Sequence, residues 1–121
     1  MTNRNNSIKI SRGDSMTLTH VVTYANGSYV DLTDSTPYFT VKTDMTLPDG
    51  SAIIQKTADL TDPVNGECVF VILPEDTAID IDSYFYDIQV TFSGSDVRTS
   101  ESGTFQVLQD VTKSWRVKFI N

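Results

Sequence analysis

Apolar and polar residues alternate with a period of two along most of this chain. The clearest stretch runs from residue 84 to residue 92, where Phe85, Asp87 and Gln89 separate the apolar positions. Those positions are Tyr84, Tyr86, Ile88, Val90 and Phe92. A period of two places alternate side chains on one face of a β-strand. The pattern therefore predicts strands rather than helices, with a central strand at 84–92.

Turn-forming residues separate the alternating segments. Asn26-Gly27 favours a tight hairpin, so we expect Ser28–Leu32 to return beside the strand before it. Pro74–Ala78 favours a short helical turn, because proline suits the first position of a helix. The expected strands are Ser7–Ile10, Met16–Tyr24, Ser28–Leu32, Tyr38–Thr43, Ala52–Lys56, Glu67–Leu73, Tyr84–Phe92 and Val97–Leu108. About seven or eight short antiparallel strands predict an all-β sandwich.

Length and composition agree with one globular domain. The chain has 121 residues, of which 39% are hydrophobic and 21% charged. Its longest apolar run, Val69–Leu73, is far shorter than a membrane span, and the N-terminus lacks the apolar segment of a secretory signal. We therefore expect no membrane partner.

The charge distribution is uneven. The net charge is −7, which argues against a nucleic-acid partner. Residues 13–112 hold all 16 acidic residues, whereas residues 1–12 and 113–121 hold basic residues and no acid. The chain therefore combines basic ends with an acidic body.

Several segments resemble the immunoglobulin-like modules of tailed-phage virion proteins, above all the N-terminal domains of phage baseplate upper proteins. They are Ile8–Val22, VDLTDSTPYFTVK from Val30, IQKTADLTDPVNGECVFVILPEDTA from Ile54, and SYFYDIQVTFSGSDVRTSESGTFQVLQDVT from Ser83. The resemblance implies an all-β, immunoglobulin-like β-sandwich over residues 8–112. Residues 1–7 are then expected to be a flexible basic N-terminus, and 113–121 a basic, aromatic strand or arm.

The same resemblance implies a non-enzymatic structural protein of the phage particle, associated with the baseplate, tail or head. Its partners would be other virion proteins and further copies of itself, and its location the virion after synthesis in the host cytoplasm. The alternative function is an adhesion module that binds a glycan or protein of the host surface, since many sandwich domains bind through their loops. The outward aromatic residues Phe85 and Tyr29 are candidate platforms for a sugar ring.

The residues with catalytic or metal-binding chemistry are few. His20 is the only histidine and Cys68 the only cysteine, so the chain cannot assemble the usual zinc ligand sets, and we interpret both as core residues. Asp76, Asp80 and Asp82 lack the spacing of a calcium loop, and a solvated acidic loop is the favoured interpretation. We expect no catalytic residue, no bound metal and no cofactor.

Two further motifs have structural interpretations. Arg12-Gly13-Asp14 is a tripeptide of integrin ligands, but a turn or bulge between strands uses the same residues. Tyr84 lies two positions before Tyr86, the spacing of the tyrosine that braces a corner in immunoglobulin domains.

The C-terminal segment alternates an aromatic face with a cationic face. Trp115, Val117 and Phe119 alternate with Arg116 and Lys118. The segment is either a last strand of its own sandwich or an arm that adds to a neighbouring subunit. We take these five residues as the candidate partner-binding residues, because their positive charge complements the acidic body.

Overall fold

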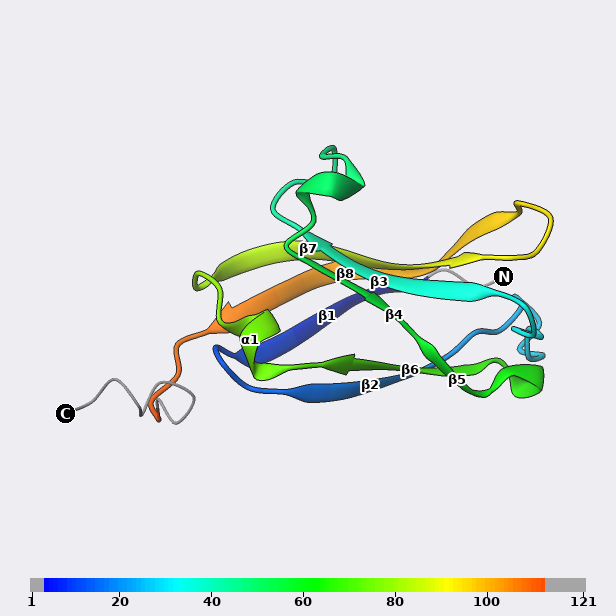
Figure 1. Cartoon of the computed structure of the whole chain (residues 1–121), viewed down its shortest axis with the longest axis horizontal. Coiled ribbons are helices and arrows are strands. Elements are labelled where there is room, and N and C mark those ends of the chain that lie inside the picture. The colour runs from blue at the N-terminus through cyan, green and yellow to red at the C-terminus, as the bar shows by residue number, and fades with distance from the viewer. Residues whose placement is uncertain (1–3, 113–121) are drawn as a thin grey trace.

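The computed structural model describes residues 4–112, which form two packed β-sheets (Figure 1). The strands are β1 (Arg4–Ser11), β2 (Met16–Val21), β3 (Thr36–Lys42), β4 (Ile54–Thr57), β5 (Asp59–Asp62), β6 (Glu67–Ile72), β7 (Asp82–Thr91) and β8 (Val97–Leu108). Within these described residues, helical structure is limited to α1 (Pro74–Thr77) and two 3₁₀ turns, Asp49–Ser51 and Pro63–Asn65. The short helical turn expected at Pro74 is confirmed.

The sheet topology is that of an immunoglobulin-like sandwich. One sheet has the order β1-β8-β7-β3-β4 and the other the order β2-β6-β5. In immunoglobulin nomenclature the eight strands correspond in order to A, B, C, C′, D, E, F and G, with C′ added to the GFC sheet as in variable-type domains. Strand β1 joins the sheet of β8 rather than that of β2. The expected all-β, immunoglobulin-like sandwich of about seven or eight strands is therefore confirmed.

One strand pair departs from the antiparallel expectation. β1 runs parallel to β8, with Ile8 opposite Phe105 and Ile10 opposite Val107. The chain crosses to the other sheet directly after β1, so the first and last strands become neighbours in the same direction. β1 also begins at Arg4, so residues 4–7 belong to the sheet rather than to the flexible terminus assigned to 1–7.

The turn expected at Asn26-Gly27 forms, and the chain returns beside the preceding strand, since the Val30 N–H donates to the Val22 carbonyl at 3.0 Å. The regular strand expected at Ser28–Leu32 is nevertheless absent from the described elements. Gly27 adopts a positive φ of 89°, and its N–H donates to the Tyr24 carbonyl at 2.9 Å. Only an isolated bridge between Thr23 and Tyr29 follows. The chain then crosses between the sheets, and the Leu32 N–H donates to the Pro63 carbonyl at 2.8 Å.

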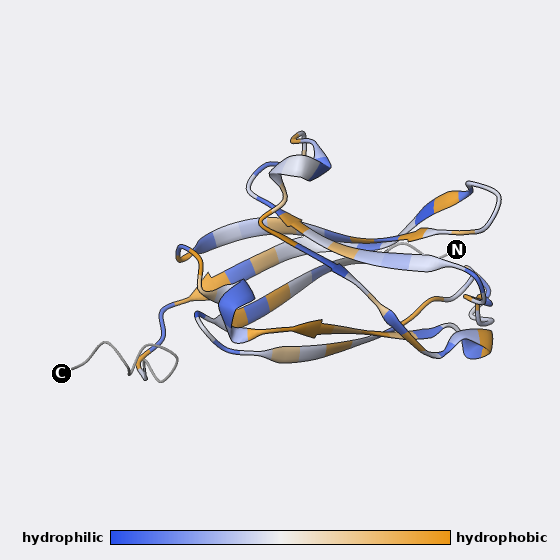
Figure 2. Ribbon diagram, viewed as in Figure 1, coloured by the Kyte–Doolittle hydropathy of each residue, from blue (hydrophilic) through white to orange (hydrophobic). Residues whose placement is uncertain are grey.

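The core lies between the two sheets and is centred on aromatic rings. Phe39 on β3 packs against Phe70, Tyr86 and Phe105, with ring centroids 5.8, 5.4 and 6.0 Å away. Figure 2 shows the hydrophobic positions alternating with hydrophilic ones along the strands. Cys68 is fully buried on β6, opposite His20 on β2, which confirms its interpretation as a core residue.

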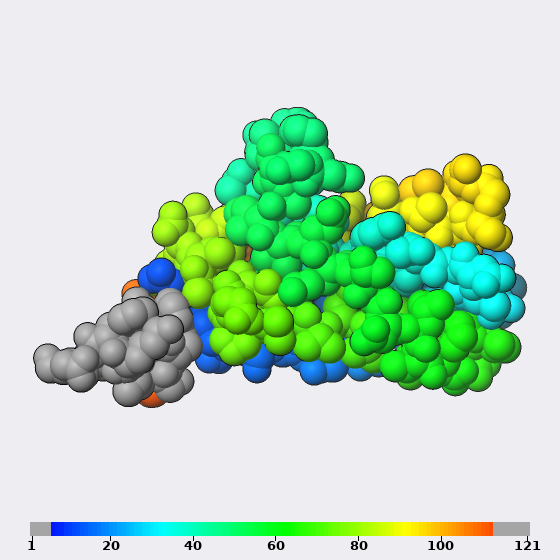
Figure 3. All heavy atoms as spheres, viewed as in Figure 1, coloured from blue at the N-terminus to red at the C-terminus, as the bar shows by residue number. Residues whose placement is uncertain are grey.

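The connections gather at the two ends of the sandwich. The β2–β3 segment contacts the β5–β6 turn through backbone hydrogen bonds, and the β7–β8 turn lies at that same end (Figure 1). The β1–β2 turn, α1 and the end of β8 lie at the opposite end. The β3–β4 loop (43–53) projects separately from the body, as Figure 3 shows. Within residues 4–112, no helix is long and apolar enough to span a bilayer.

Candidate interaction surfaces

The predicted partner-binding residues lie outside the part of the chain that the structure describes. They are Trp115, Arg116, Val117, Lys118 and Phe119. The last described strand, β8, ends at Leu108, and Val111 is 92% exposed just before the C-terminal segment. The candidate interaction surfaces among the described residues therefore lie on the sandwich itself.

A groove of about 500 Å³ lies on the outer face of the five-stranded sheet. We call it the sheet groove. Its floor contains a transverse row of polar residues from four adjacent strands, since each residue of the row is opposite the next in the strand register. The row runs Gln55 (β4), Thr40 (β3), Asp87 (β7) and Ser102 (β8).

Two aromatic side chains flank this row. Tyr38 on β3 is opposite Gln89, two residue pairs along from Asp87, and Phe85 on β7 is opposite Lys42, two residue pairs away on the other side. Both aromatic residues line the sheet groove because they alternate with the core residues Phe39, Tyr84 and Tyr86 of the same strands. Phe85 is 36% exposed.

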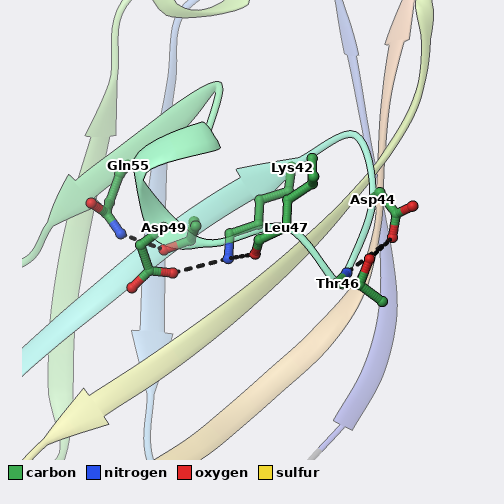
Figure 4. A network of polar contacts seen from close by, with 7 residues as sticks. Lys42, Asp44, Thr46, Leu47, Asp49 and Gln55 are labelled. Atoms are coloured by element: carbon green, nitrogen blue, oxygen red, sulfur yellow. Dashed lines mark hydrogen bonds and ion pairs between the residues drawn. The ribbon is translucent and has the colours of Figure 1, made fainter.

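The 43–53 loop forms one wall of the sheet groove and is held by Lys42 (Figure 4). The Lys42 ammonium donates to the Leu47 carbonyl at 2.7 Å and to the Asp49 carboxylate at 2.9 Å. Asp44 accepts hydrogen bonds from the Thr46 backbone and hydroxyl, each at 2.9 Å. The amide of Gln55 donates to Thr40 at 3.2 Å. The loop therefore has a defined anchor at the start of its path.

Asp87 is the acidic residue on the groove floor. Partial burial raises the pKa of its carboxyl group above the ordinary value; the Lys42 charge acts in the opposite direction, and Asp49 adds a further upward effect. Among the described residues, no donor hydrogen-bonds to this carboxylate. The groove thus presents a partly desolvated acceptor whose lone pairs are available to a ligand.

The loop end of the sandwich carries exposed apolar side chains among acids. Tyr24, Tyr29, Val64 and Val97 are 47%, 58%, 63% and 46% exposed. The acids of these loops include Asp31, Asp34, Asp62 and Asp96. A small hollow of about 260 Å³ lies between the β2–β3 segment and the β7–β8 turn. This end of the sandwich is a second candidate interaction surface. Tyr29, the predicted platform for a sugar ring, is largely exposed to solvent there.

A buried polar cluster lies between the sheets, and of its members only His20 and Tyr86 were expected in the core from the sequence pattern. The Nε2 atom of His20 is 2.7 Å from the Ser100 hydroxyl, and its Nδ1 atom is 3.8 Å from the Glu101 carboxyl group. The hydroxyl of Tyr86 donates to Glu101 at 2.6 Å. Burial, and then the contact with Glu101, raise the pKa of Tyr86.

A β-bulge explains why both Ser100 and Glu101 point inward. Glu101 is opposite Ile88 and Thr99 is opposite Gln89, so Ser100 is an extra residue on β8. The cluster contains the residue types of a serine, histidine and acid triad. However, Ser100 is 3% and Glu101 7% exposed, so a substrate would reach the hydroxyl only if the sheets separated. The arrangement is that of a hydrogen-bonded core, as interpreted for His20.

The acidic loop before β7, which contains Asp76 and Asp80, is held by an ion pair and hydrogen bonds rather than being fully solvated. The carboxylate of Asp76 forms an ion pair with Lys56 at 2.7 Å and accepts the Leu73 N–H at 2.8 Å. The backbone carbonyl of Asp80 accepts the hydroxyl of Tyr84. Among residues 4–112, no group of three or more histidine, cysteine or acidic side chains is arranged to hold a metal ion.

The Arg12-Gly13-Asp14 tripeptide forms the turn between β1 and β2, which confirms its structural interpretation. The Asp14 N–H donates to the Ser11 carbonyl at 3.1 Å. The Thr77 hydroxyl of α1 donates to the Asp14 carbonyl at 2.7 Å, so the turn packs on the helix. Gly13 is buried in this contact.

Comparisons with known proteins were made for the whole chain. The family model described as the BppU N-terminal domain matches residues 1–113. A search of curated proteins found no match. Two similar solved structures are the immunoglobulin-like domain of mouse leukocyte-associated immunoglobulin-like receptor 1, in a strand-swapped dimer, and CopC from Methylosinus trichosporium OB3b. The first has a TM-score of 0.47 and 21% identity, covering 87% of this chain and 91% of that one. The second has a TM-score of 0.42 and 12% identity, covering 88% of this chain and 89% of that one.

Proposed function

The chain belongs to the family of BppU N-terminal domains, the N-terminal domains of phage baseplate upper proteins, and from this premise we propose that it is a non-enzymatic structural component of the phage particle. The observation that carries this proposal is the family match over residues 1–113, which includes every strand of the sandwich. The protein is made in the host cytoplasm and assembles into the virion through contacts with other virion proteins.

The sandwich architecture supports a structural role. Eight strands pack around an aromatic core, and the polar residues with catalytic potential lie inside that core rather than on a groove. A rigid body of this kind presents loops and sheet edges at fixed positions, which suits repeated contacts in a symmetric assembly.

We assign the homo-oligomeric contact to the C-terminal segment. Trp115, Val117 and Phe119 supply apolar anchors, while Arg116 and Lys118 supply positive charge. Among the described strands, β5 is a short edge strand, and its exposed residues Asp59 and Asp62 complement such a segment. The segment of one copy adds along this acidic edge of the next.

Labelling of intact particles tests the virion assignment. Gold-conjugated antibody against this protein should decorate purified phage at a fixed site, and electron microscopy should place the label at the baseplate. Particles that carry no label, while the same antibody detects the protein in infected-cell lysate, would refute the assignment.

A truncation tests the assembly contact separately. Removal of residues 113–121 should convert an oligomer into a monomer, as measured by light scattering. The sandwich itself should be retained, because β8 ends at Leu108, before the deletion. Asp59→Lys should weaken the same association by charge repulsion, with Asp44→Lys in the 43–53 loop as the matched control. An oligomer that the truncation leaves unchanged would contradict the proposed contact of the C-terminal segment, but it would not bear on the assignment of the protein to the phage particle.

A further inference from the structure

The sheet groove has the size of a ligand site, and nothing in the proposed structural role uses it. Its volume of about 500 Å³ lies within the range of roughly 300–1,000 Å³ that is usual for small-molecule sites. It is bounded by the 43–53 loop, which Lys42 anchors. The site is therefore preformed rather than dependent on closure of a mobile loop.

The lining of the sheet groove is dominated by neutral hydrogen-bonding groups. Hydroxyls and amides come from Thr40, Gln55, Gln89, Thr91 and Ser102. Among the described residues, neither the Gln89 amide nor the Ser102 hydroxyl has a hydrogen-bond partner, and Asp87 accepts none. These side chains offer both donors and acceptors in closely spaced rows, which matches a ligand that carries many hydroxyl groups.

Two aromatic rings add flat apolar surfaces to this polar floor. Tyr38 is opposite Gln89, four residues along β7 from Phe85, so their Cα positions are about 14 Å apart along the sheet. A chain of sugar rings has apolar C–H faces alternating with hydroxyl edges. Such a ligand can stack on both rings while its hydroxyls reach the row between them.

Other ligand classes fit the groove less well. A nucleic acid would meet the carboxylates of Asp87 and Asp49, and the Lys42 ammonium is already bound to Asp49. An extended peptide would find no free backbone, because β3 and β7 are hydrogen-bonded to strands on both sides. An acidic sugar would be repelled by the same two carboxylates.

We propose that the sheet groove binds a neutral oligosaccharide, with Tyr38 and Phe85 stacking on sugar rings and with Asp87, Gln89 and Ser102 hydrogen-bonding to sugar hydroxyls. This binding activity is independent of where the chain lies in the particle. It gives the module a sugar-binding face in addition to its protein contacts.

The test is an NMR titration of the full chain with three neutral probes, cellotetraose, maltotetraose and tetra-N-acetylchitotetraose. At least one probe should shift the backbone amides of residues 38–42 and 85–91 saturably, at millimolar concentration. Phe85→Ala and Asp87→Asn should each weaken that binding at least about fivefold, because each removes a stacking surface or a charge-assisted acceptor. Tyr29→Ala removes a still more exposed aromatic ring from the loop end and should leave the affinity of the sheet groove unchanged.

Three outcomes would overturn the proposal. The first is the absence of saturable shifts in the groove with all three neutral probes. The second is binding that persists in both groove variants or extends equally to a hyaluronan tetrasaccharide, which is acidic. The third is competition for the same amides by a synthetic peptide of residues 113–121, which would make the groove the receptor of the C-terminal segment. None of these outcomes changes the particle-labelling result.

Discussion

The hydroxyl of Tyr84 donates a hydrogen bond to the backbone carbonyl of Asp80, 2.5 Å away and four residues upstream. The bond closes the corner through which the chain passes from α1 into β7. Tyr84 lies two residues before Tyr86, whose ring packs against Phe39 in the core. This is the tyrosine corner of immunoglobulin domains, and it confirms the role expected for Tyr84 from its spacing alone.

Replacement of Tyr84 by phenylalanine should therefore destabilise the fold while keeping its packing. The change removes one partly buried hydrogen bond and leaves the Asp80 carbonyl without that donor, so the free energy of unfolding should fall by about 1 kcal/mol. Urea denaturation measures this difference. Tyr38→Phe is the matched control, because the Tyr38 hydroxyl has no hydrogen-bond partner among the described residues, and equal losses in the two variants would contradict the prediction.

A second prediction concerns the close approach of β1 to β8. A Cβ atom added at Gly103 would lie 1.7 Å from the backbone carbonyl oxygen of Asn6, so Gly103→Ala forces β1 away from its partner. Amide exchange across β1 should accelerate, and the loss of stability should reach about 2–4 kcal/mol. Gly50→Ala is the control, since a Cβ atom there meets nothing within 4 Å. Unchanged exchange in β1 of the Gly103 variant would show that the strand adapts.

The third prediction is a loss of stability at alkaline pH. Burial, and secondly the Glu67 charge, raise the pKa of the Cys68 thiol from 9.0 to about 12. Below pH 9 the thiol is protonated in both states and the stability is complete. Above pH 9 the unfolded chain loses the proton that the folded chain keeps, so the free energy of unfolding falls until about pH 12. The loss should reach about 1 kcal/mol by pH 10.

Urea denaturation between pH 8.5 and pH 10 isolates this effect. The pKa values of Tyr84 and Tyr86 are raised from 10.0, so these two groups add their own losses mainly above pH 10. Cys68→Ala costs packing at every pH, but its stability should vary less over this interval. Parallel curves for the wild type and the variant would contradict the assignment.

The strands were predictable where local pattern and tertiary environment agree. The expected Val97–Leu108 has the bounds of β8, and Glu67–Leu73 differs from β6 by one residue. The buried residues of β6 lie at alternate positions, as do Phe105 and Val107 in the second half of β8, so the period of two is visible in the sequence. The sequence pattern did not predict β5, because none of its four side chains is fully buried and a short, exposed edge strand has no hydrophobic alternation.

The sheet groove and the buried polar cluster around His20 could not be predicted from the sequence, for a different reason. The sheet groove depends on strand register, which sets Thr40 opposite Asp87, 47 positions away, and Asp87 opposite Ser102, 15 positions away. Of the groove residues, the sequence predicts a ligand-stacking role for Phe85 alone, because an aromatic residue on the polar side of an alternating strand is recognisable without knowledge of the strand pairing. The cluster around His20 depends on the bulge at Ser100, and a single inserted residue in a regular pattern gives no local signal.

The last prediction measures the coupling within that cluster. Tyr86→Phe removes the hydroxyl that donates to the buried Glu101 carboxyl group at 2.6 Å, and should cost about 1–3 kcal/mol of unfolding free energy. Glu101→Gln weakens the same contact, so the double variant should lose less than the two single losses added together, by about 1 kcal/mol. Tyr84→Phe combined with Glu101→Gln is the control cycle, because the Tyr84 hydroxyl bonds to Asp80 instead, and its losses should add. Additivity in both cycles would mean that the contact between Tyr86 and Glu101 contributes no stability of its own.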